Sequence, residues 1–524
     1  MDIHTLIKPS EYHDSVTLMT VARELASYPG VGDAAVIMGT ESNISILKQA
    51  GLYSKEAEKA SPNDLVITFS APEDIAQKVF QEADRLLNQK PTNEGEAGEY
   101  RPKTIAAAVK ANPEANVAVI SVAGRYATIE AWNALRKGLH VLLFSDNVSL
   151  EDEIALKIYA RDHGLLLMGP GAGTVLLNGV ALGFANVIPA GPVGIVSAAG
   201  TGLQEVSTLL AKNGMGITQG IGTGGRDLKE DVGGIMMLEG LKALQADPDT
   251  KVIALVSKPP SKGVAEAILD QVSSGNKPAI IGFMGSNPED WTAVPNAIPA
   301  STLEETALLA AKVAGANLED PRGMVEQRTQ ELRVKAQELQ ASLKPGQRYL
   351  RGLYSGGTLC YEAQAIWRDM LSEPVLSNAP LRKEFQLPDS TRSQRHSAVD
   401  LGEEEFTVGR PHPMIDNDLR IRRLLQEARD PEVAVILLDV VLGYGAHPNP
   451  ASELGPAARR AIEHAKSEGR DLFVIASITG TEQDPQVLSK QSAMLVDNGV
   501  IICESNAAAA RLAGMIVSKE RGGK

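Results

Sequence analysis

Two stretches of the chain share a pattern that is typical of anion-binding helix starts. In residues 193–205 and again in residues 352–362, a short apolar run leads into a Gly-Thr pair, and a Glu follows four residues after the Thr. The first N–H groups of a helix lack intrahelical acceptors and the dipole is positive there, so small residues let an anion approach. The repeat predicts two sites that hold one oxyanion between them. The residues predicted to bind phosphate or substrate in this way are Ser197, Gly200, Thr201, Ser355, Gly357 and Thr358.

The same pattern has a purely structural alternative. A tight turn from strand to helix also favours Gly, and a Thr at that place can simply cap the helix. Glu205 and Glu362 lie one turn inside their helices, which favours a packing or capping role over a catalytic one.

Two basic residues follow predicted strands in the middle of the chain. Arg226 comes after the glycine-rich residues 222–225, and its planar guanidinium suits a carboxylate or a phosphate. Lys258 precedes two prolines at a strand end, where it would bind a substrate anion. The alternatives are a turn with a surface ion pair for Arg226 and a plain loop for Lys258.

Histidines supply the candidate acid/base groups in the last third of the chain. Arg410 and His412 lie in a loop that Pro411 and Pro413 stiffen, and His447 follows a predicted strand and residues 443–445. An imidazole can exchange a proton near neutral pH or donate a hydrogen bond. We therefore expect His412, Arg410 and His447 as catalytic residues, and an ordinary loop role is the alternative for each.

Nucleotide and metal sites have weaker support. Ser145, Asp146 and Asn147 follow one predicted strand and residues 169–174 follow another, so both segments are candidates to line a cofactor pocket. Neither has the G-x-G-x-x-G spacing of a dinucleotide site, and no His, Cys, Asp or Glu spacing indicates a metal. We expect no metal.

Short apolar runs separated by helical patterns indicate where these residues are positioned. Runs that are apolar on both faces predict a parallel sheet covered by helices, and we expect residues 1–185 to form one Rossmann-like domain. The runs lie at residues 34–38, 64–69, 117–122, 140–144 and 165–168.

The rest of the chain contains the same order of landmarks twice. Residues 190–315 and 346–524 each show a strand with a Gly-Thr helix, a glycine-rich turn and two further strands with polar loops. This predicts two flavodoxin-like domains, with ligands at the carboxyl ends of their strands. Residues 316–345 are charged with helical spacing and predict a helical linker.

Composition excludes several classes of function. The chain has 524 residues and a net charge of −14, which argues against nucleic acid as a partner. It has two cysteines and no signal-peptide pattern, and no run reaches about 18 apolar residues, so we expect a cytoplasmic protein without membrane segments.

Several segments resemble the FdrA/YahF group of acyl-CoA-synthetase-like proteins, within the succinyl-CoA synthetase superfamily, over nearly the whole length. The resemblance implies a Rossmann-like CoA-binding-type domain followed by two flavodoxin-like domains, succinyl-CoA synthetase α-like at 190–315 and β-like (CoA-ligase) at 346–524. The matching segments are residues 14–19, 144–148, 222–228, 257–260, 407–416 and 441–445.

Two departures from the superfamily limit what the resemblance implies. Its nucleoside-diphosphate-forming ligases carry a phosphorylatable His after the last strand of the first flavodoxin-like domain, but this chain has no His between His163 and His396. The nucleotide-grasping domain of the ligase β subunit is also missing. FdrA relatives are associated with an oxamate carbamoyltransferase of allantoin breakdown, which needs separately encoded subunits. The resemblance thus implies a similar phosphate-dependent carbamoyl or acyl transfer.

Our leading hypothesis is a subunit of such a transferase, acting on a small carboxylate or carbamoyl-bearing substrate with separately encoded partners, a homo-oligomeric assembly, or both. It requires no cofactor, although phosphate, carbamoyl phosphate or CoA would bind. The alternatives are a succinate-CoA ligase-like enzyme and a non-catalytic metabolite-binding scaffold.

Overall fold

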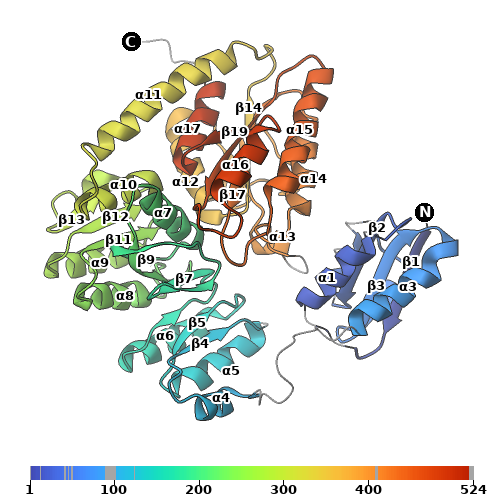
Figure 1. The fold of residues 1–524 in the computed structure, drawn as a ribbon, viewed down its shortest axis with the longest axis horizontal. Helices are drawn as coiled ribbons and strands as arrows, with labels where there is room; N and C mark the ends of the chain where they lie inside the picture. The colour runs from blue at the N-terminus through green and yellow to red at the C-terminus, as the bar shows by residue number, and fades with distance from the viewer. Residues whose placement is uncertain are drawn as a thin grey trace. The chain divides into compact units, whose positions relative to one another are not determined.

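The computed structural model describes residues 2–11, 13, 15–26, 28–40, 43–44, 47–48, 51–88, 102–122, 124–407 and 411–518 (Figure 1). The chain divides into two compact units. One unit comprises Met1–Tyr100 with Glu403–His412, and the other comprises Arg101–Gly402 with Pro413–Lys524.

The first unit contains a three-stranded antiparallel sheet in the order β1-β3-β2. Its core includes Leu25, Phe69 and Val79, which are fully buried between the sheet and the helices. Its elements are β1 (Asp2–Lys8), α1 (Ser15–Ala26), β2 (Asp33–Met38), η1 (Ala57–Lys59), β3 (Leu65–Ala71), α3 (Glu73–Asn88) and α13 (Glu404–Thr407).

This unit differs from the predicted first domain. The apolar runs at 34–38 and 64–69 are strands, but they pair antiparallel and belong to a sheet of their own. The central strand β3 is buried along most of its length, so its apolar run looks the same as that of a parallel strand. The described strands of residues 1–185 therefore contribute to three sheets instead of one.

The second unit begins with a parallel sheet in the order β4-β5-β6, which confirms the strands predicted near residues 117–122, 140–144 and 165–168. Helices alternate with these strands as the Rossmann-like pattern predicts. The elements are α4 (Ile105–Ala111), β4 (Val117–Ile120), α5 (Gly124–Leu135), β5 (His140–Leu143), α6 (Leu150–Asp162) and β6 (Leu167–Met168).

The next domain has a seven-stranded sheet in the order β13-β12-β11-β9-β10-β7-β8. Five of the strands are parallel, and the β7-β8 hairpin adds to one edge. The elements are β7 (Thr174–Leu177), β8 (Val180–Gly183), β9 (Ala190–Ser197), α7 (Gly200–Lys212), β10 (Ile217–Gly222), α8 (Ile235–Ala246), β11 (Val252–Ser257), α9 (Lys262–Ser274), β12 (Ala279–Phe283), η2 (Pro288–Trp291), β13 (Ala297–Pro299) and α10 (Leu303–Val313).

The last domain has a six-stranded parallel sheet in the order β15-β16-β14-β17-β18-β19. The elements are β14 (Tyr349–Tyr354), α12 (Gly357–Met370), β15 (Leu376–Ser377), η3 (Lys383–Phe385), β16 (Ser397–Asp400), α14 (Asp418–Glu427), β17 (Val433–Val441), α15 (Ala451–Ser467), β18 (Phe473–Thr479), α16 (Leu488–Val496), β19 (Ile501–Cys503) and α17 (Asn506–Val517).

The two sheets confirm the predicted duplication. When the two-residue edge strand β15 is left out, the parallel strands follow the order 2-1-3-4-5 in both domains, as β10-β9-β11-β12-β13 and as β16-β14-β17-β18-β19. This is the flavodoxin-like order. It makes α7 the counterpart of α12, and α10 the counterpart of α17.

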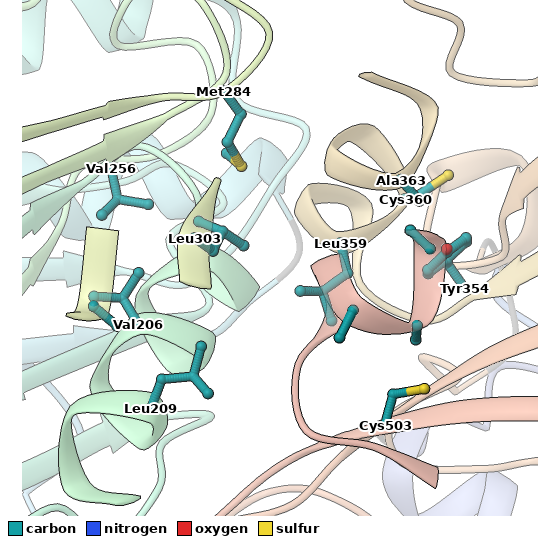
Figure 2. Close-up of a cluster of buried hydrophobic side chains, with 14 of the residues drawn as sticks. Val206, Leu209, Val256, Met284, Leu303, Tyr354, Leu359, Cys360, Ala363 and Cys503 are labelled. Carbon is teal, nitrogen blue, oxygen red and sulfur yellow. The ribbon is translucent and has the colours of Figure 1, made fainter. Parts of the chain in front are cut away.

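The two flavodoxin-like domains share one hydrophobic core. In Figure 2, Val206, Leu209 and Leu303 of the first domain lie opposite Leu359 and Cys503 of the second. Burial of apolar surface is the main favourable term in such packing. The faces that carry α7 with α10 and α12 with α17 therefore pack against each other, which fixes the helix starts relative to one another.

Helix α11 (Pro321–Gln340) connects the two domains, within the predicted linker at 316–345 (yellow in Figure 1). Only Pro321 and Ala336 of this helix are buried, in agreement with its charged sequence. Among the described residues, the helices are all too short or too polar to span a bilayer.

Candidate functional site

The two predicted helix starts touch each other. Helices α7 and α12 begin directly after β9 and β14, at the carboxyl ends of these strands. A Cβ atom placed on Gly356 would lie 2.8 Å from Cγ2 of Thr201, and one on Gly202 would lie 2.9 Å from Cγ2 of Thr358. Each Thr thus packs on a Gly of the opposite helix start. The two glycines are not equivalent in the duplicated motif, because Gly202 lies inside α7 whereas Gly356 precedes α12.

The start of α7 leaves backbone donors open. The residue before the helix is Ala199, which provides no side-chain cap, and Gly200 and Thr201 are half-buried. In the first turn of any helix, the N–H groups have no intrahelical acceptor. Thr174 lies beside them, with its Oγ1 3.6 Å from a Cβ built on Gly200. This end of α7 has the geometry of an anion site.

Ser197 does not face this site. Its hydroxyl donates to the carbonyl of Ala199 at 2.8 Å and accepts from the N–H of Ala199 at 3.1 Å. With 1% of its surface exposed, Ser197 shapes the turn before α7 instead of offering a donor to a ligand.

The turn just before α12 already holds a carboxylate of the chain itself. Asp439 of β17 accepts hydrogen bonds at 2.8 Å from the N–H groups of Ser355 and Gly356, and at 3.0 Å from the Ser355 hydroxyl. Arg420 forms an ion pair with Asp439 at 3.0 Å, and all these side chains are buried. Ser355 was predicted to bind phosphate, but its donors are taken because the internal carboxylate satisfies them.

Gly357 also lies against a carboxylate. Asp400, at the end of β16, approaches Gly357 so closely that a Cβ there would clash with Oδ2, and its Oδ1 accepts from the N–H of Gly402 at 2.9 Å. Two acidic side chains therefore surround the α12 start, next to the 5% exposed Thr358.

The duplication is broken at the position of Asp439. Leu353 pairs with Leu438 in one sheet and Val196 pairs with Leu255 in the other, so Asp439 corresponds to Val256. An apolar side chain stands at the α7 start where an acid stands at the α12 start. Of the two predicted anion sites, the α7 start is the one without an internal anion at this position.

Glu205 and Glu362 cap helices of the opposite domain. Glu205 accepts from the N–H of Asn506, the first residue of α17, at 3.0 Å. Glu362 accepts from the N–H of Leu303, the first residue of α10, at 2.7 Å. Because α10 and α17 are counterparts, the two contacts are equivalent. The capping role that the sequence favoured is what the geometry shows.

Asn506 joins the two capping residues. Its side-chain amide donates to Oε2 of Glu362 at 2.8 Å, while its backbone N–H binds Glu205. Both glutamates are 1% exposed. Desolvation by burial raises the pKa of Glu362 to about 7, against the hydrogen bonds from Asn506 and Leu303, and the nearby charge of Glu205 adds to the rise.

Lys258 is brought to the side of α12. Its ammonium nitrogen lies 5.4 Å from the centre of the Tyr361 ring, three residues beyond Thr358. A cation in this position over an aromatic face is favourable and stays accessible. Lys258 therefore provides a positive charge along the helix whose start holds Asp439.

Arg226 forms an ion pair and a hydrogen bond within the second unit. Its Nε lies 2.8 Å from the buried Glu153 carboxylate, and its Nη2 donates to the carbonyl of Val148 at 2.7 Å. Glu153 also pairs with the fully buried Lys157, which in turn binds Asp227. Arg226 thus links α6 and the residue Val148 before it to the turn that follows β10. Its predicted role in substrate binding stays a prediction.

The loop predicted to line a cofactor pocket has one buried residue and two exposed residues. Ser145 is 7% exposed, and its hydroxyl accepts from the N–H of Val122 at 2.9 Å. Asp146 and Asn147 are exposed, and the Asn147 amide donates to Asp146 at 3.2 Å. Cofactor binding there stays a prediction for the two exposed residues.

The three predicted catalytic residues are described to different extents. His447 is held within its own loop, where Nδ1 accepts from the N–H of Asn449 at 3.1 Å and Nε2 lies 3.3 Å from Glu453. His412 is half-buried and belongs to the first unit, and Arg410 lies outside the described residues.

Sequence reasoning missed two important residues. Asp439 had a signal, because it is the one acid in the otherwise apolar run at 433–441. A buried acid in such a run demands a partner. Asn506 had none, since an Asn at a helix start is common in turns and caps.

Comparison with protein families gives three matches along the chain. Residues 1–103 match the AllF heavy metal-associated domain, residues 190–285 match the CoA binding domain, and residues 353–516 match the CoA-ligase family. The CoA binding match falls on the first flavodoxin-like domain, not on the segment expected to be of that type.

The first of these family names raises the question of a metal. Residues 1–103 contain no cysteine. In the part of the chain that the structure describes, no three His, Cys, Asp or Glu side chains gather in a way that could hold a metal ion.

Two similar proteins match the chain over different lengths. "Uncharacterized protein YahF" of Escherichia coli (strain K12) is 42% identical over 99% of both chains. The succinate-CoA ligase [ADP-forming] subunit alpha of Staphylococcus epidermidis (strain ATCC 12228 / FDA PCI 1200) is 28% identical over 33% of this chain and 56% of its own length.

Among solved structures, a dinucleotide-forming acetyl-coenzyme A synthetase 1 of Ca. Korarchaeum cryptofilum, in complex with phosphate and ADP, aligns with 82% of this chain and 87% of its own. The identity is 16% and the TM-score 0.30. The full-length match to YahF and the two CoA-ligase-type domains show that the chain belongs to the FdrA/YahF family of succinyl-CoA synthetase-like proteins.

Proposed function

We propose that the chain is a subunit of an enzyme that transfers a carbamoyl or acyl group reversibly to phosphate. The observation that carries the proposal is the contact between an open helix start on α7 and the start of α12, where the Asp439 carboxylate is bound in the turn just before the helix. Phosphate would bind at Gly200 and Thr201, beside Thr174.

The reaction would be a phosphorolysis. An oxygen of phosphate attacks the carbonyl carbon of a carbamoyl-bearing substrate, the carbon–nitrogen bond breaks, and the leaving nitrogen takes a proton. The products are carbamoyl phosphate and a small carboxylate-bearing amide. Backbone donors at a helix start stabilise charge on the phosphate oxygens without reorganisation. Lys258 would attract the anionic substrate from the side of α12.

The sequence supports this reaction over ligation through a phosphohistidine. No His occurs between His163 and His396, so the segment after β12 has none to carry a phosphoryl group. His396 itself is buried and accepts a hydrogen bond from the N–H of Leu350. Phosphate would therefore enter as a free substrate, and separately encoded partner subunits would complete the enzyme.

Thr201→Val tests the assignment of the α7 start. Valine keeps the packing against Gly356 and removes only the hydroxyl, so the rate of phosphate-dependent product formation should fall about tenfold or more. The assay follows carbamoyl phosphate formed from oxalurate and phosphate by the full chain with the products of neighbouring genes.

Thr329→Val on α11 is the matched control, since its hydroxyl bonds only to its own helix at Val325. It should leave the rate unchanged. Absence of carbamoyl phosphate above background with the unaltered chain would remove this substrate, and equal rates for both variants would remove the α7 site.

A second function is favoured by the family matches. The CoA binding and CoA-ligase families cover residues 190–285 and 353–516, as in enzymes that join CoA to a small acid. This alternative predicts heat of CoA binding in calorimetry and labelled protein after incubation with radioactive ATP. Failure of both measurements would leave only the phosphorolytic proposal.

A further inference from the structure

We propose that a cavity beside the interface of the two flavodoxin-like domains binds a small amphipathic monocarboxylate, with the Lys212 ammonium group as its anchor. The cavity has a volume of about 460 Å³, within the range of small-molecule sites. The end of α7, α10, α11, α16 and β19 surround it. Leu209 and Cys503, which line it, come from opposite domains in Figure 2.

The cavity is separate from the site proposed for phosphate. Lys212 is the last residue of α7, and Gly200 is the first. A helix rises 1.5 Å per residue, so the two ends of α7 are about 18 Å apart. A ligand in the cavity would therefore not occupy the α7 start.

The acidic residues of the cavity wall already have partners. Glu304 forms ion pairs with Arg328 and, at 2.9 Å, with Arg511. Glu504 also pairs with Arg328. Glu482 accepts two hydrogen bonds at 2.9 Å, from the N–H and the hydroxyl of Ser489. In the part of the chain that the structure describes, none of these three carboxylates forms an ion pair with Lys212, although their negative charges remain at the cavity wall.

Lys212, unlike the acidic residues of the wall, forms one hydrogen bond and no ion pair among the described residues. Its ammonium nitrogen donates to the carbonyl of Ile478 at 3.2 Å, and within the described residues it forms no ion pair with a carboxylate. An ammonium group has three donors, so two are available to a ligand. Desolvation by burial lowers the pKa of Lys212, although the charges of Glu205 and Glu504 oppose this. Lys212 is exposed as a residue, so water reaches the ammonium group, and a ligand carboxylate would take the place of that water.

The remainder of the wall is largely apolar and favours a hydrocarbon chain. Leucine and isoleucine side chains form most of it, and burial raises the pKa of the Cys503 thiol to about 12, which keeps it neutral. A second carboxylate on the ligand would meet the charges of Glu482 and Glu504. The chemistry therefore selects a monocarboxylate. The apolar residues are Leu209, Leu308, Ile478, Leu488 and Ile502.

Isothermal titration of the full chain with sodium hexanoate tests the site. The unaltered chain should bind, and Lys212→Gln should weaken binding about ten- to hundredfold, as expected for loss of a hydrogen bond to a charged group. The control is Lys262→Gln on α9, whose side chain is 93% exposed, and it should bind as the unaltered chain does. Absence of binding to the unaltered chain would overturn the proposal.

Two further comparisons give the test its specificity. Hexanol should bind more weakly than hexanoate, and so should succinate and inorganic phosphate. A tighter complex with any of these three would overturn the ligand class. Ser492→Phe should fill the cavity and abolish hexanoate binding with little change in thermal unfolding. Unchanged affinity in Ser492→Phe or in Lys212→Gln would place the ligand elsewhere and overturn the site.

Discussion

Glu362 carries its carboxyl group in a place where ionisation is unfavourable. Burial raises its pKa to about 7, whereas its ordinary value is 4.5. Between these two values the folded chain binds more protons than the unfolded chain. The contribution of Glu362 to stability is therefore present in acid and is lost as the pH rises through about 7.

Glu362→Gln should remove this pH dependence. Gln keeps the acceptor for the N–H of Leu303 and cannot ionise, so its free energy of unfolding relative to the unaltered chain should rise by up to about 3 kcal/mol between pH 4.5 and 7. Urea unfolding at pH 5, 6 and 7.5 measures it. Glu463→Gln on the exposed face of α15 is the control. Parallel pH profiles for Glu362→Gln and the unaltered chain would contradict the prediction.

For single residues, the sequence predicted where a side chain lies better than it predicted what that side chain does. The spacing of Thr201 and Thr358 was sufficient to place both at helix starts that meet. It was not sufficient to show that Asp439 fills one of them, because that depends on which strand becomes the neighbour of β14. The same carboxylate occupies the donors of Ser355, whose predicted role in phosphate binding stays a prediction.

At the scale of elements, the contact of α7 with α12 depends on two glycines without side chains. Gly356→Ala would place a methyl group 2.8 Å from Thr201, and Gly202→Ala would place one 2.9 Å from Thr358. Overpacking of this kind costs about 1–3 kcal/mol in the free energy of unfolding. Urea unfolding of both variants measures the effect.

Gly263→Ala is the matched control for these two variants. Gly263 lies in α9, and a Cβ there would meet no atom within 4 Å. Alanine is the better helix former by about 0.5–1 kcal/mol, so this variant should be as stable as the unaltered chain or more stable. Equal losses in all three variants would show that the helix contact is not the cause.

Among the helices and strands, the sequence did not predict the direction of one strand or the presence of an edge hairpin. The strand order of both flavodoxin-like sheets followed from the repeated landmarks. The β7-β8 hairpin was missed, although Asn178 and Gly179 between its strands are a strong hairpin signal. The direction of β3 had no signal, because a buried central strand is apolar in either direction.

At the scale of the whole molecule, the chain has two units with separate cores. The first has its own buried cluster around Phe69, whereas the core around Leu303 and Leu359 is common to both flavodoxin-like domains. Domains with separate cores unfold separately, and elements that share a core unfold together. The sequence did not predict the boundary near residue 100, because the apolar runs on both sides of it are alike.

Calorimetry should therefore show two unfolding transitions for the full chain. A variant that lacks residues 1–100 should lose one of them and keep the other, with a midpoint within a few degrees of its original value. The second transition should contain both flavodoxin-like domains, since their core is continuous. A single transition that shifts as a whole on deletion would contradict the prediction.

The reciprocal caps have a consequence for a severed polypeptide. Thr302 and Ser505 cap α10 and α17 from within their own domains, but the N–H groups of Leu303 and Asn506 find their acceptors, Glu362 and Glu205, in the other domain. A backbone break within the exposed part of α11 would leave two fragments that each need the other. Their reassembly would have a stoichiometry of one to one, because each fragment both gives and receives a single cap.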